Sequence, residues 1–278
     1  MISEIRLASE RDIPDLCAIW QSAFEDPEDY IKYFYSENFK RILIPVYALD
    51  GKPVSMIHLM DAFFSDGEED LPVRFIYAAA TLPAYRSNGF MQTLILDAKR
   101  AAEENGYGLF LKPSPRLREF YAGLGFMEDS RFRVFRTAPE KPGTNGAACF
   151  PLSAEEYNRM RNSALGARPY VKWPDAHVKW CVDENDFCGG KTLAVELGGD
   201  SNRHYLTGYT AKSVLHVTET DLSPGQLRDA ASALCGLFGA DSMEVLFPED
   251  ASFEGETIVS SAVFNAPLRH TYANLLLF

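Results

Sequence analysis

Residues 79–91, which read AATLPAYRSNGFM, and residues 120–126, which read FYAGLGF, decide the fold of this chain. The first stretch begins at the end of a β-rich run, residues 73–82. It passes through a loop with proline and glycine and enters a segment with helical apolar spacing. Free backbone N–H groups and the helix dipole at such a helix N-terminus favour a bound phosphate. The order of strand, loop and helix therefore predicts a phosphate-binding loop.

Two residues of this loop carry the chemistry that a phosphate requires. Gly89 has no side chain, so the backbone can approach a phosphate closely. Arg86 adds a cationic donor beside the anion. Taken alone, an arginine and a glycine at this spacing are typical of an ordinary surface loop with a left-handed turn. The strand before the loop, the amphipathic helix after it and residues 120–126 favour a cofactor site instead.

The two stretches together resemble the signature motifs of the GNAT superfamily of N-acetyltransferases. The first family pattern is V-x-P-x-x-R-x-x-G-x-G/A, and the second is an aromatic residue followed by Tyr-x-x-x-Gly-Phe. The positions that match in register are Thr81, Pro83, Arg86 and Gly89 for the first pattern and Tyr121, Gly125 and Phe126 for the second. The resemblance covers residues 2–137.

Three positions depart from the family patterns. Thr81 stands where valine is usual, and the two side chains have similar shapes. Met91 stands where glycine or alanine is usual, and its larger side chain can crowd a pyrophosphate. Ser114 replaces an asparagine that is common seven residues before the tyrosine, and its hydroxyl can still cap the helix. Met91 and Ser114 therefore motivate an alternative in which the chain binds a ligand without catalysis.

The resemblance implies a fold, a co-substrate and a set of site residues. The fold is α/β (α+β): a GNAT fold with a mixed, mostly antiparallel central sheet, followed by a second, degenerate GNAT-like domain. The co-substrate is acetyl-CoA, whose acetyl group a primary amine takes by direct attack, without an acyl-enzyme. The residues implied for acetyl-CoA binding are Ala79, Ala80, Thr81, Arg86, Ser87, Asn88, Gly89, Phe90, Met91 and Ser114. The backbone at residues 79–81 would pair with pantetheine and polarise the thioester carbonyl, and Tyr121 would protonate the departing thiolate.

Tyr121 also has a purely structural interpretation, in which its ring packs beside Phe126 and its hydroxyl bonds to the backbone. The matched register favours the catalytic role. The amine must lose a proton before it attacks, and the sequence singles out no base. The acidic candidates, which are usually solvated in such places, are Glu25, Asp26, Glu68, Glu69 and Asp70.

The length of 278 residues predicts two domains, because it exceeds the commonest domain size. Residues 138–147 are dense in proline and glycine without periodic apolar residues, so they are the predicted linker. Residues 1–137 are then the catalytic domain and residues 148–278 the second domain. The second half repeats the order of elements of the first, which suggests a degenerate duplication. It has no R-x-x-G-x-G/A loop between a strand and a helix and is not expected to bind CoA.

This layout resembles a shortened form of the enhanced intracellular survival acetyltransferases of aminoglycosides. In that branch the terminal carboxylate can serve as the base, and this chain ends at Phe278 on a predicted strand. The other expected elements include a hairpin at Asp50-Gly51, a helix capped by Ser223-Pro224, and strands over residues 131–136, 243–247, 258–264 and 272–278.

The composition limits the partners and the location. The formal net charge of -12 repels phosphate backbones and anionic lipid and suits a cationic amine, although an acidic surface is more often a solubility feature. The five cysteines form no C-x-x-C pair and are typical of reduced thiols. The N-terminal residues show no basic region that leads into an apolar stretch, and no apolar run approaches membrane-spanning length, so neither a secretory leader nor a membrane span is expected. We therefore expect a cytoplasmic protein that binds neither nucleic acid nor membrane.

The histidines and tryptophans of the second half point to packing rather than chemistry. His177 and His204 show no metal-ligand spacing together with the cysteines, so no metal is expected. Trp173, His177 and Trp180 follow helical spacing, which is typical of core packing and can also line a substrate cavity.

Three functions follow from these observations. The first is acetyl transfer to a primary amine of a small cationic acceptor. The second is acyl-CoA binding or ligand sensing without catalysis. An aminoacyl-tRNA-dependent transferase is disfavoured, because tRNA binding needs a basic track. The oligomeric state is open, and a homo-oligomer is compatible with the sequence.

Overall fold

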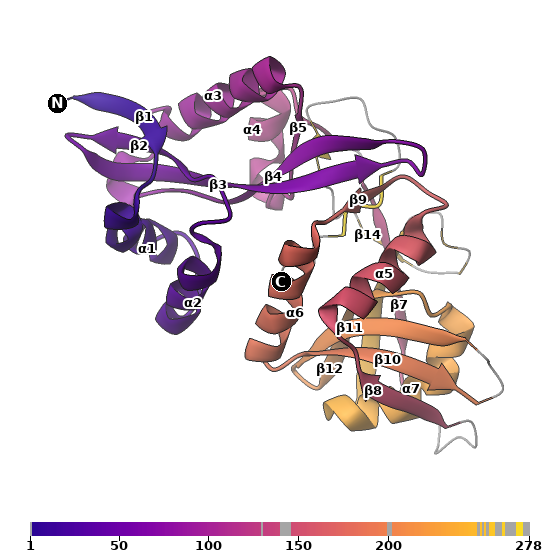
Figure 1. Ribbon diagram of the computed structural model, residues 1–278. Helices are drawn as coiled ribbons and strands as arrows, with labels where there is room; N and C mark the ends of the chain where they lie inside the picture. Colours follow the sequence, from indigo (N-terminus) through magenta and orange to yellow (C-terminus); the bar gives the residue numbers. More distant parts are fainter. Residues whose placement is uncertain are drawn as a thin grey trace. The chain divides into compact units, whose positions relative to one another are not determined.

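The computed structural model of the chain is shown in Figure 1. It describes residues 2–128, 130–139, 146–198 and 202–248, together with residues 251, 253, 256–258, 263–264 and 271–274. The chain forms two units, each with its own sheet. The first unit comprises residues 1–64, 70–129 and 262–268, and the second comprises residues 65–69, 130–261 and 269–278.

The first unit is a sheet with helices on both of its faces (Figure 1). Its helices are α1 (Ile13–Gln21), α2 (Glu28–Asn38), α3 (Phe90–Asn105) and α4 (Arg118–Gly123). Its strands are β1 (Ser3–Leu7), β2 (Pro45–Leu49), β3 (Lys52–Ser65), β4 (Asp70–Thr81), β5 (Gly108–Leu111), β6 (Met127–Glu128) and β15 (Val263–Phe264), in the order β1-β2-β3-β4-β5-β15-β6. Strands β4 and β5 pair in parallel, whereas β1 with β2, β2 with β3, and β15 with both β5 and β6 pair antiparallel. The sheet is therefore mixed and mostly antiparallel, as predicted.

The predicted hairpin at Asp50-Gly51 connects β2 to β3. Asp50 has a φ of 46° and Gly51 a φ of 80°, and they lie between the paired residues Leu49 and Lys52. Two successive residues with positive φ form the tight turn whose twist matches that of the flanking strands. Glycine adopts this conformation without strain and aspartate tolerates it, so the dipeptide determines the turn locally.

The second unit repeats this kind of architecture. Its helices are α5 (Ala154–Leu165), α6 (Asp175–Phe187) and α7 (Pro224–Phe238). Its strands are β7 (Phe132–Thr137), β8 (Ala147–Pro151), β9 (Tyr170–Lys172), β10 (Lys191–Leu197), β11 (Arg203–Ala211), β12 (Val214–Thr220), β13 (Ser242–Pro248) and β14 (Glu256–Ile258). The sheet of this unit has the order β14-β7-β13-β12-β11-β10-β8 and does not include β9. Ser223 caps α7 as predicted, because its side chain accepts a hydrogen bond from the backbone N–H of Gln226 at 3.3 Å.

Both units contain a parallel strand pair that is joined by a helix. In the first unit β4, α3 and β5 follow one another and the two strands pair in parallel. In the second unit β12, α7 and β13 do the same, and the other recorded pairs of that sheet are antiparallel. The prediction of a second domain of the same fold type is therefore confirmed.

Two strands join a different sheet from the one that their place in the sequence suggests. The sequence analysis groups residues 131–136 with the first half, but β7 pairs with β13 and β14 in the second sheet. The predicted strand over residues 258–264 is divided, because β14 joins the second sheet while β15 pairs with β5 and β6 in the first. A short strand can pair with any open sheet edge that it reaches, so its partner is set by the fold and not by local pattern.

Some predicted features fall partly outside the described residues. The structure does not describe residues 140–145 of the predicted linker or residues 275–278 of the last predicted strand. In the second unit, Tyr272 forms an isolated parallel bridge with Tyr170. The functional division into a catalytic domain, a linker and a second domain stays a prediction.

Among the helices in the described part of the chain, none is both long and apolar enough to span a membrane.

A buried histidine in the first unit makes stability depend on pH. The His58 side chain is fully buried, and burial lowers its pKa from 6.5 to about 4. The unfolded chain therefore binds more protons than the folded chain between these two pH values. We expect the free energy of unfolding to fall by on the order of 3 kcal/mol as the pH drops through this window, and this contribution to level off below it.

Urea titrations at a series of pH values between 4 and 7 measure this dependence. In the second unit, burial also lowers the pKa of His177, to about 3, which adds to the slope. His58→Phe should reduce the slope without abolishing it. A wild-type stability that stays constant across the window would contradict the prediction.

Candidate active site

The parallel strands β4 and β5 separate before β4 ends. Their pairing joins Val73 to Gly108, Arg74 to Leu109 and Phe75 to Phe110, and no further pair between them is recorded in the described part of the chain. Strand β5 ends at Leu111, whereas β4 continues to Thr81. Residues 76–81 therefore lack a β5 partner on that side. Residues 79–81, for which the resemblance implies a splayed strand edge, lie in this stretch.

Strand β4 contains a backbone irregularity at this edge. Ala78 has a φ of 45°, which is unusual for a residue other than glycine. Downstream of it, the hydroxyl of Ser55 on β3 lies 3.2 Å from the carbonyl oxygen of Ala80 and 2.8 Å from the hydroxyl of Thr81. The Thr81 side chain and the Ala80 carbonyl oxygen are thus both engaged by β3.

The predicted phosphate loop has the backbone geometry of an anion cradle. Ser87 and Gly89 both have positive φ, at 64° and 79°, and the exposed loop leads directly into α3. Within the described residues, no hydrogen bond from the backbone N–H groups of residues 87–92 is recorded. The first turn of α3 contains no acidic residue that would repel an anion. A Cβ added at Gly89 would meet nothing within 4 Å, so there is room for a phosphate. These residues fit a pyrophosphate, and the cradle forms with Met91 in place.

Arg86 braces this loop through its guanidinium group. Its Nε donates to the carbonyl oxygen of Thr81 at 3.1 Å, and its Nη2 donates to that of Ser22 at 3.2 Å. Asn88 adds two side-chain hydrogen bonds of 3.2 Å, to the carbonyl oxygens of Tyr85 and Arg86. Arg86 therefore ties the loop to the end of β4 and to the end of α1, a role that the sequence analysis did not predict.

Tyr121 lies on α4 with its side chain buried. The residue is 5% exposed, and its ring packs edge-on against Phe126 and Phe120 at centroid distances of 5.9 and 5.1 Å. Gly125, with a φ of 81°, closes the turn in which the N–H groups of Leu124 and Phe126 donate to the Tyr121 carbonyl. Burial raises the pKa of Tyr121 to about 12, so its hydroxyl stays protonated at neutral pH. No hydrogen bond of that hydroxyl is recorded within the described part of the chain.

The other predicted residues lie less close to this chemistry. Ser114 is exposed and precedes the short turn before α4, but its side chain makes no capping hydrogen bond there. Among the acidic candidates, Asp26 accepts a hydrogen bond from Trp20 Nε1 at 2.8 Å, and Glu25 is exposed. Glu68, Glu69 and Asp70 are exposed at the opposite end of β4 from residues 79–81. Glu68, Glu69 and Asp70 therefore lie away from the splayed strand edge, whereas Asp26 is hydrogen-bonded to Trp20, whose ring centroid lies 5.6 Å from that of Tyr77.

An aromatic cluster that the sequence analysis missed packs against β4 beside Ala78. It consists of Trp20 from α1, Phe34 and Tyr35 from α2, His58 from β3 and Tyr77 from β4. Recorded ring centroids are 4.7 to 6.4 Å apart. The spacing of these residues along their helices and strands predicts only that they are core positions. No pattern within a short stretch of sequence indicates that two helices and two strands bring these rings together.

In the second unit, the side chains of Trp173, His177 and Trp180 pack against one another. Trp173 and His177 stack with centroids 4.2 Å apart, and His177 lies 5.9 Å from Trp180. Both tryptophans are 2% exposed. Of the two readings, core packing is the one that these contacts support.

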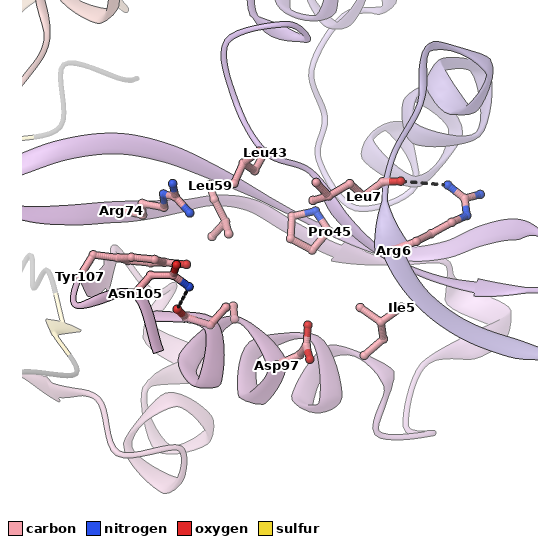
Figure 2. A pocket seen from close by; sticks show the side chains of 12 residues that line it. Ile5, Arg6, Leu7, Leu43, Pro45, Leu59, Arg74, Asp97, Asn105 and Tyr107 are labelled. Atoms are coloured by element: carbon pink, nitrogen blue, oxygen red, sulfur yellow. Dashed lines mark hydrogen bonds between the residues drawn. The ribbon is translucent and has the colours of Figure 1, made fainter. Parts of the chain in front are cut away.

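The first unit also has a hollow of about 520 Å³ beside α3 (Figure 2). Apolar residues from three strands and their flanks line one side, and the C-terminal half of α3 lines the other. Arg74 at its rim donates to Asp61 at 2.7 Å and lies 4.3 Å from the centroid of the Tyr107 ring. The cradle lies at the opposite end of α3, so this hollow is separate from it.

Comparison with known proteins gives one family and one fold. The family model described as an acetyltransferase (GNAT) domain matches residues 4–128. No curated protein sequence matches the chain. Many solved structures do, at low sequence identity.

Three solved structures illustrate the likeness. A probable N-acyltransferase from Enterococcus faecalis V583 matches with a TM-score of 0.72 and 9% identity, over 95% of this chain and 72% of that one. Eis1 from Mycobacterium abscessus matches with a TM-score of 0.65 and 13% identity, over 94% and 73%. A tandem GNAT protein from the clavulanic acid biosynthesis pathway matches with a TM-score of 0.57 and 11% identity, over 96% and 100%. At these identities the likeness concerns the fold.

Proposed function

Because residues 4–128 of this chain belong to the GNAT acetyltransferase family, we propose that the protein is a cytoplasmic N-acetyltransferase. It transfers the acetyl group of acetyl-CoA to a primary amine of a small cationic molecule by direct attack. The observation that carries the proposal is a row of backbone N–H groups at residues 87–92 for which no acceptor is recorded in the described part of the chain. These residues form the N-terminus of α3, in the segment that follows the end of β4, where β4 and β5 have separated. A helix N-terminus of this form is suited to a pyrophosphate.

Each part of the site has a role in this proposal. Residues 86–91 hold the pyrophosphate, and the main chain of residues 79–81 pairs with the pantetheine arm in place of a strand. When bound, acetyl-CoA supplies an acetyl group activated as a thioester. A main-chain N–H of β4 stabilises the charge that develops on the thioester oxygen. Tyr121, which is protonated at neutral pH, donates its proton to the departing sulfur.

The charge of the chain supports a cationic acceptor. A formal net charge of -12 raises the local concentration of cations and lowers that of anions. The amine must be deprotonated before it attacks; Glu68, Glu69 and Asp70 lie at the far end of β4, and Asp26 already accepts a hydrogen bond from Trp20. The proposal therefore assigns the proton to a water that leads to bulk solvent.

The direct test incubates the purified full chain with acetyl-CoA and a panel of small amines. Mass spectrometry should detect the acetylated amine. A thiol reagent is unsuitable for the readout, since Cys188 is exposed and reacts with it. No product with any amine, from protein that is folded by circular dichroism, would overturn the proposal.

A pair of glycines tests the cradle within one helix. Gly89 and Gly106 flank α3, have φ values of 79° and 70°, and would each place a new Cβ in open space. Gly89→Ala and Gly106→Ala should therefore cost similar stability, about 1 kcal/mol each. Only Gly89→Ala brings a methyl group to the phosphate, so only it should weaken acetyl-CoA binding, by about tenfold.

Isothermal titration calorimetry with acetyl-CoA measures the two affinities, and thermal unfolding checks that the losses of stability match. If the two variants bind acetyl-CoA with equal affinity, the loop at residues 86–91 is not part of the binding site.

A further inference from the structure

Strand β4 contains an alanine, Ala78, in a left-handed backbone conformation that its surroundings must stabilise. Ala78 has a φ of 45°, inside a strand that runs from Asp70 to Thr81. A left-handed conformation is unfavourable for a residue with a Cβ and persists only where its surroundings impose it. It lies shortly after Phe75, where the recorded pairing of β4 with β5 ends. The strain is therefore located where the proposed thioester site requires a particular main-chain direction.

The side chain of His58 supplies the constraint on the residue before it. His58 Nδ1 lies 3.3 Å from the carbonyl oxygen of Tyr77, and His58 Nε2 lies 3.1 Å from the hydroxyl of Tyr35. His58 and Tyr35 are 0% and 2% exposed, so water does not compete for these bonds. Burial lowers the pKa of His58 to about 4 and raises that of Tyr35, so both are neutral at physiological pH.

Neutral side chains leave one consistent direction for the hydrogen bonds. The Tyr77 carbonyl can only accept, so His58 Nδ1 carries the proton and donates it. Nε2 is then the acceptor, and the hydroxyl of Tyr35 donates to it in preference to Met56 Sδ, a weaker acceptor that lies 3.6 Å from the same hydroxyl. The result is a chain of donors that runs from Tyr35 through His58 to the main chain of β4. It fixes both the tautomer and the orientation of the ring.

This chain determines which way the following N–H points. The His58 ring packs with Trp20 and Phe34, on the face of the sheet that α1 and α2 cover. The Tyr77 carbonyl is drawn toward that ring. Because no cis peptide is recorded in the described part of the chain, which includes residues 77 and 78, the N–H of Ala78 points to the side opposite the carbonyl, away from the aromatic cluster.

We propose that His58 is a positioning residue that holds the peptide between Tyr77 and Ala78 in the orientation that accompanies the left-handed conformation of Ala78, so that a main-chain N–H of β4 meets the thioester carbonyl. This inference rests on the proposed acetyl transfer. His58 itself touches neither the acetyl group nor the amine. Tyr35 supports it by occupying Nε2.

Two substitutions at position 58 separate positioning from packing. His58→Phe keeps most of the ring volume but has no donor for the Tyr77 carbonyl. His58→Asn places an amide N–H close to where Nδ1 stands, but it leaves a void in the core. Packing alone predicts that the phenylalanine variant is the better enzyme. Positioning predicts the reverse.

The first readout is steady-state kinetics with the amine that the panel identifies. His58→Phe should lower kcat at least about tenfold, since a misplaced oxyanion donor loses part of its effect. Its KM for acetyl-CoA should stay within about twofold, because the pyrophosphate loop is untouched. His58→Asn should recover most of kcat, although it unfolds at a lower temperature.

The second readout needs no acceptor. In protein labelled with ¹⁵N-alanine, an amide proton of Ala78 or Ala79 should move downfield with acetyl-CoA but not with CoA. His58→Phe should abolish this difference and His58→Asn should restore it. If the wild type shows neither turnover nor this shift, the proposed function fails. If the wild type shows both and His58→Phe retains both, the function stands and the role of His58 is wrong.

Discussion

Replacing Tyr121 by phenylalanine is expected to lower kcat at least about hundredfold while acetyl-CoA affinity stays within about twofold. Loss of a general acid typically costs two to four orders of magnitude. The ring is buried and packs against Phe126 and Phe120, so phenylalanine keeps those contacts. Because burial raises the pKa of Tyr121 to about 12, its hydroxyl also remains a donor through the mildly alkaline range.

Steady-state kinetics and calorimetry on the same preparations check this expectation. Tyr107→Phe is the matched control, since it removes a hydroxyl from a tyrosine of the same unit that follows the far end of α3. It should leave kcat unchanged. A Tyr121→Phe variant that keeps more than half of wild-type kcat would end the assignment of Tyr121 as the acid. Tight acetyl-CoA binding by a wild type that never turns over would favour the ligand-sensing alternative.

Breaking the buried ion pair of the second unit is expected to be strongly destabilising. Arg161 on α5 and Glu219 on β12 are both 0% exposed, and Arg161 Nε donates to Glu219 Oε2 at 2.8 Å. The hydroxyl of Tyr157 donates to the same oxygen. Removal of one charge leaves the other buried without a partner, which typically costs 3–5 kcal/mol. We expect a loss of about that size for Glu219→Leu.

A second and a third variant make this expectation specific. The double replacement Arg161→Met with Glu219→Leu removes both charges, so it should be less destabilising than Glu219→Leu alone. Arg203→Met breaks a partly exposed pair with Glu156, 2.7 Å long, in the same unit and should cost about 1 kcal/mol or less. Urea denaturation followed by fluorescence gives the three values. Equal losses for Glu219→Leu and Arg203→Met would refute the role of burial.

The part of the site that lies close together in the sequence was predictable, and the part assembled from distant residues was not. The loop at residues 86–91 and the turn around Gly125 follow from strand, helix and glycine signals within a few positions. Ala78 gave no such signal, because a left-handed residue inside a strand is normally read from a glycine. The contact of His58 with Tyr77 joins two strands and depends on a ring from α2.

The mixed sheet, the Asp50-Gly51 hairpin and the loop at residues 86–91 were determined by the sequence itself, because each depends on the conformational preferences of neighbouring residues. Only the tertiary structure decided that β7 joins the second sheet and β15 the first, since strand edges accept partners from any distance along the chain. It also decided that Arg86 braces the loop and that His58 faces the main chain of β4. Those contacts exist only after packing has excluded water and brought separate elements within hydrogen-bonding distance.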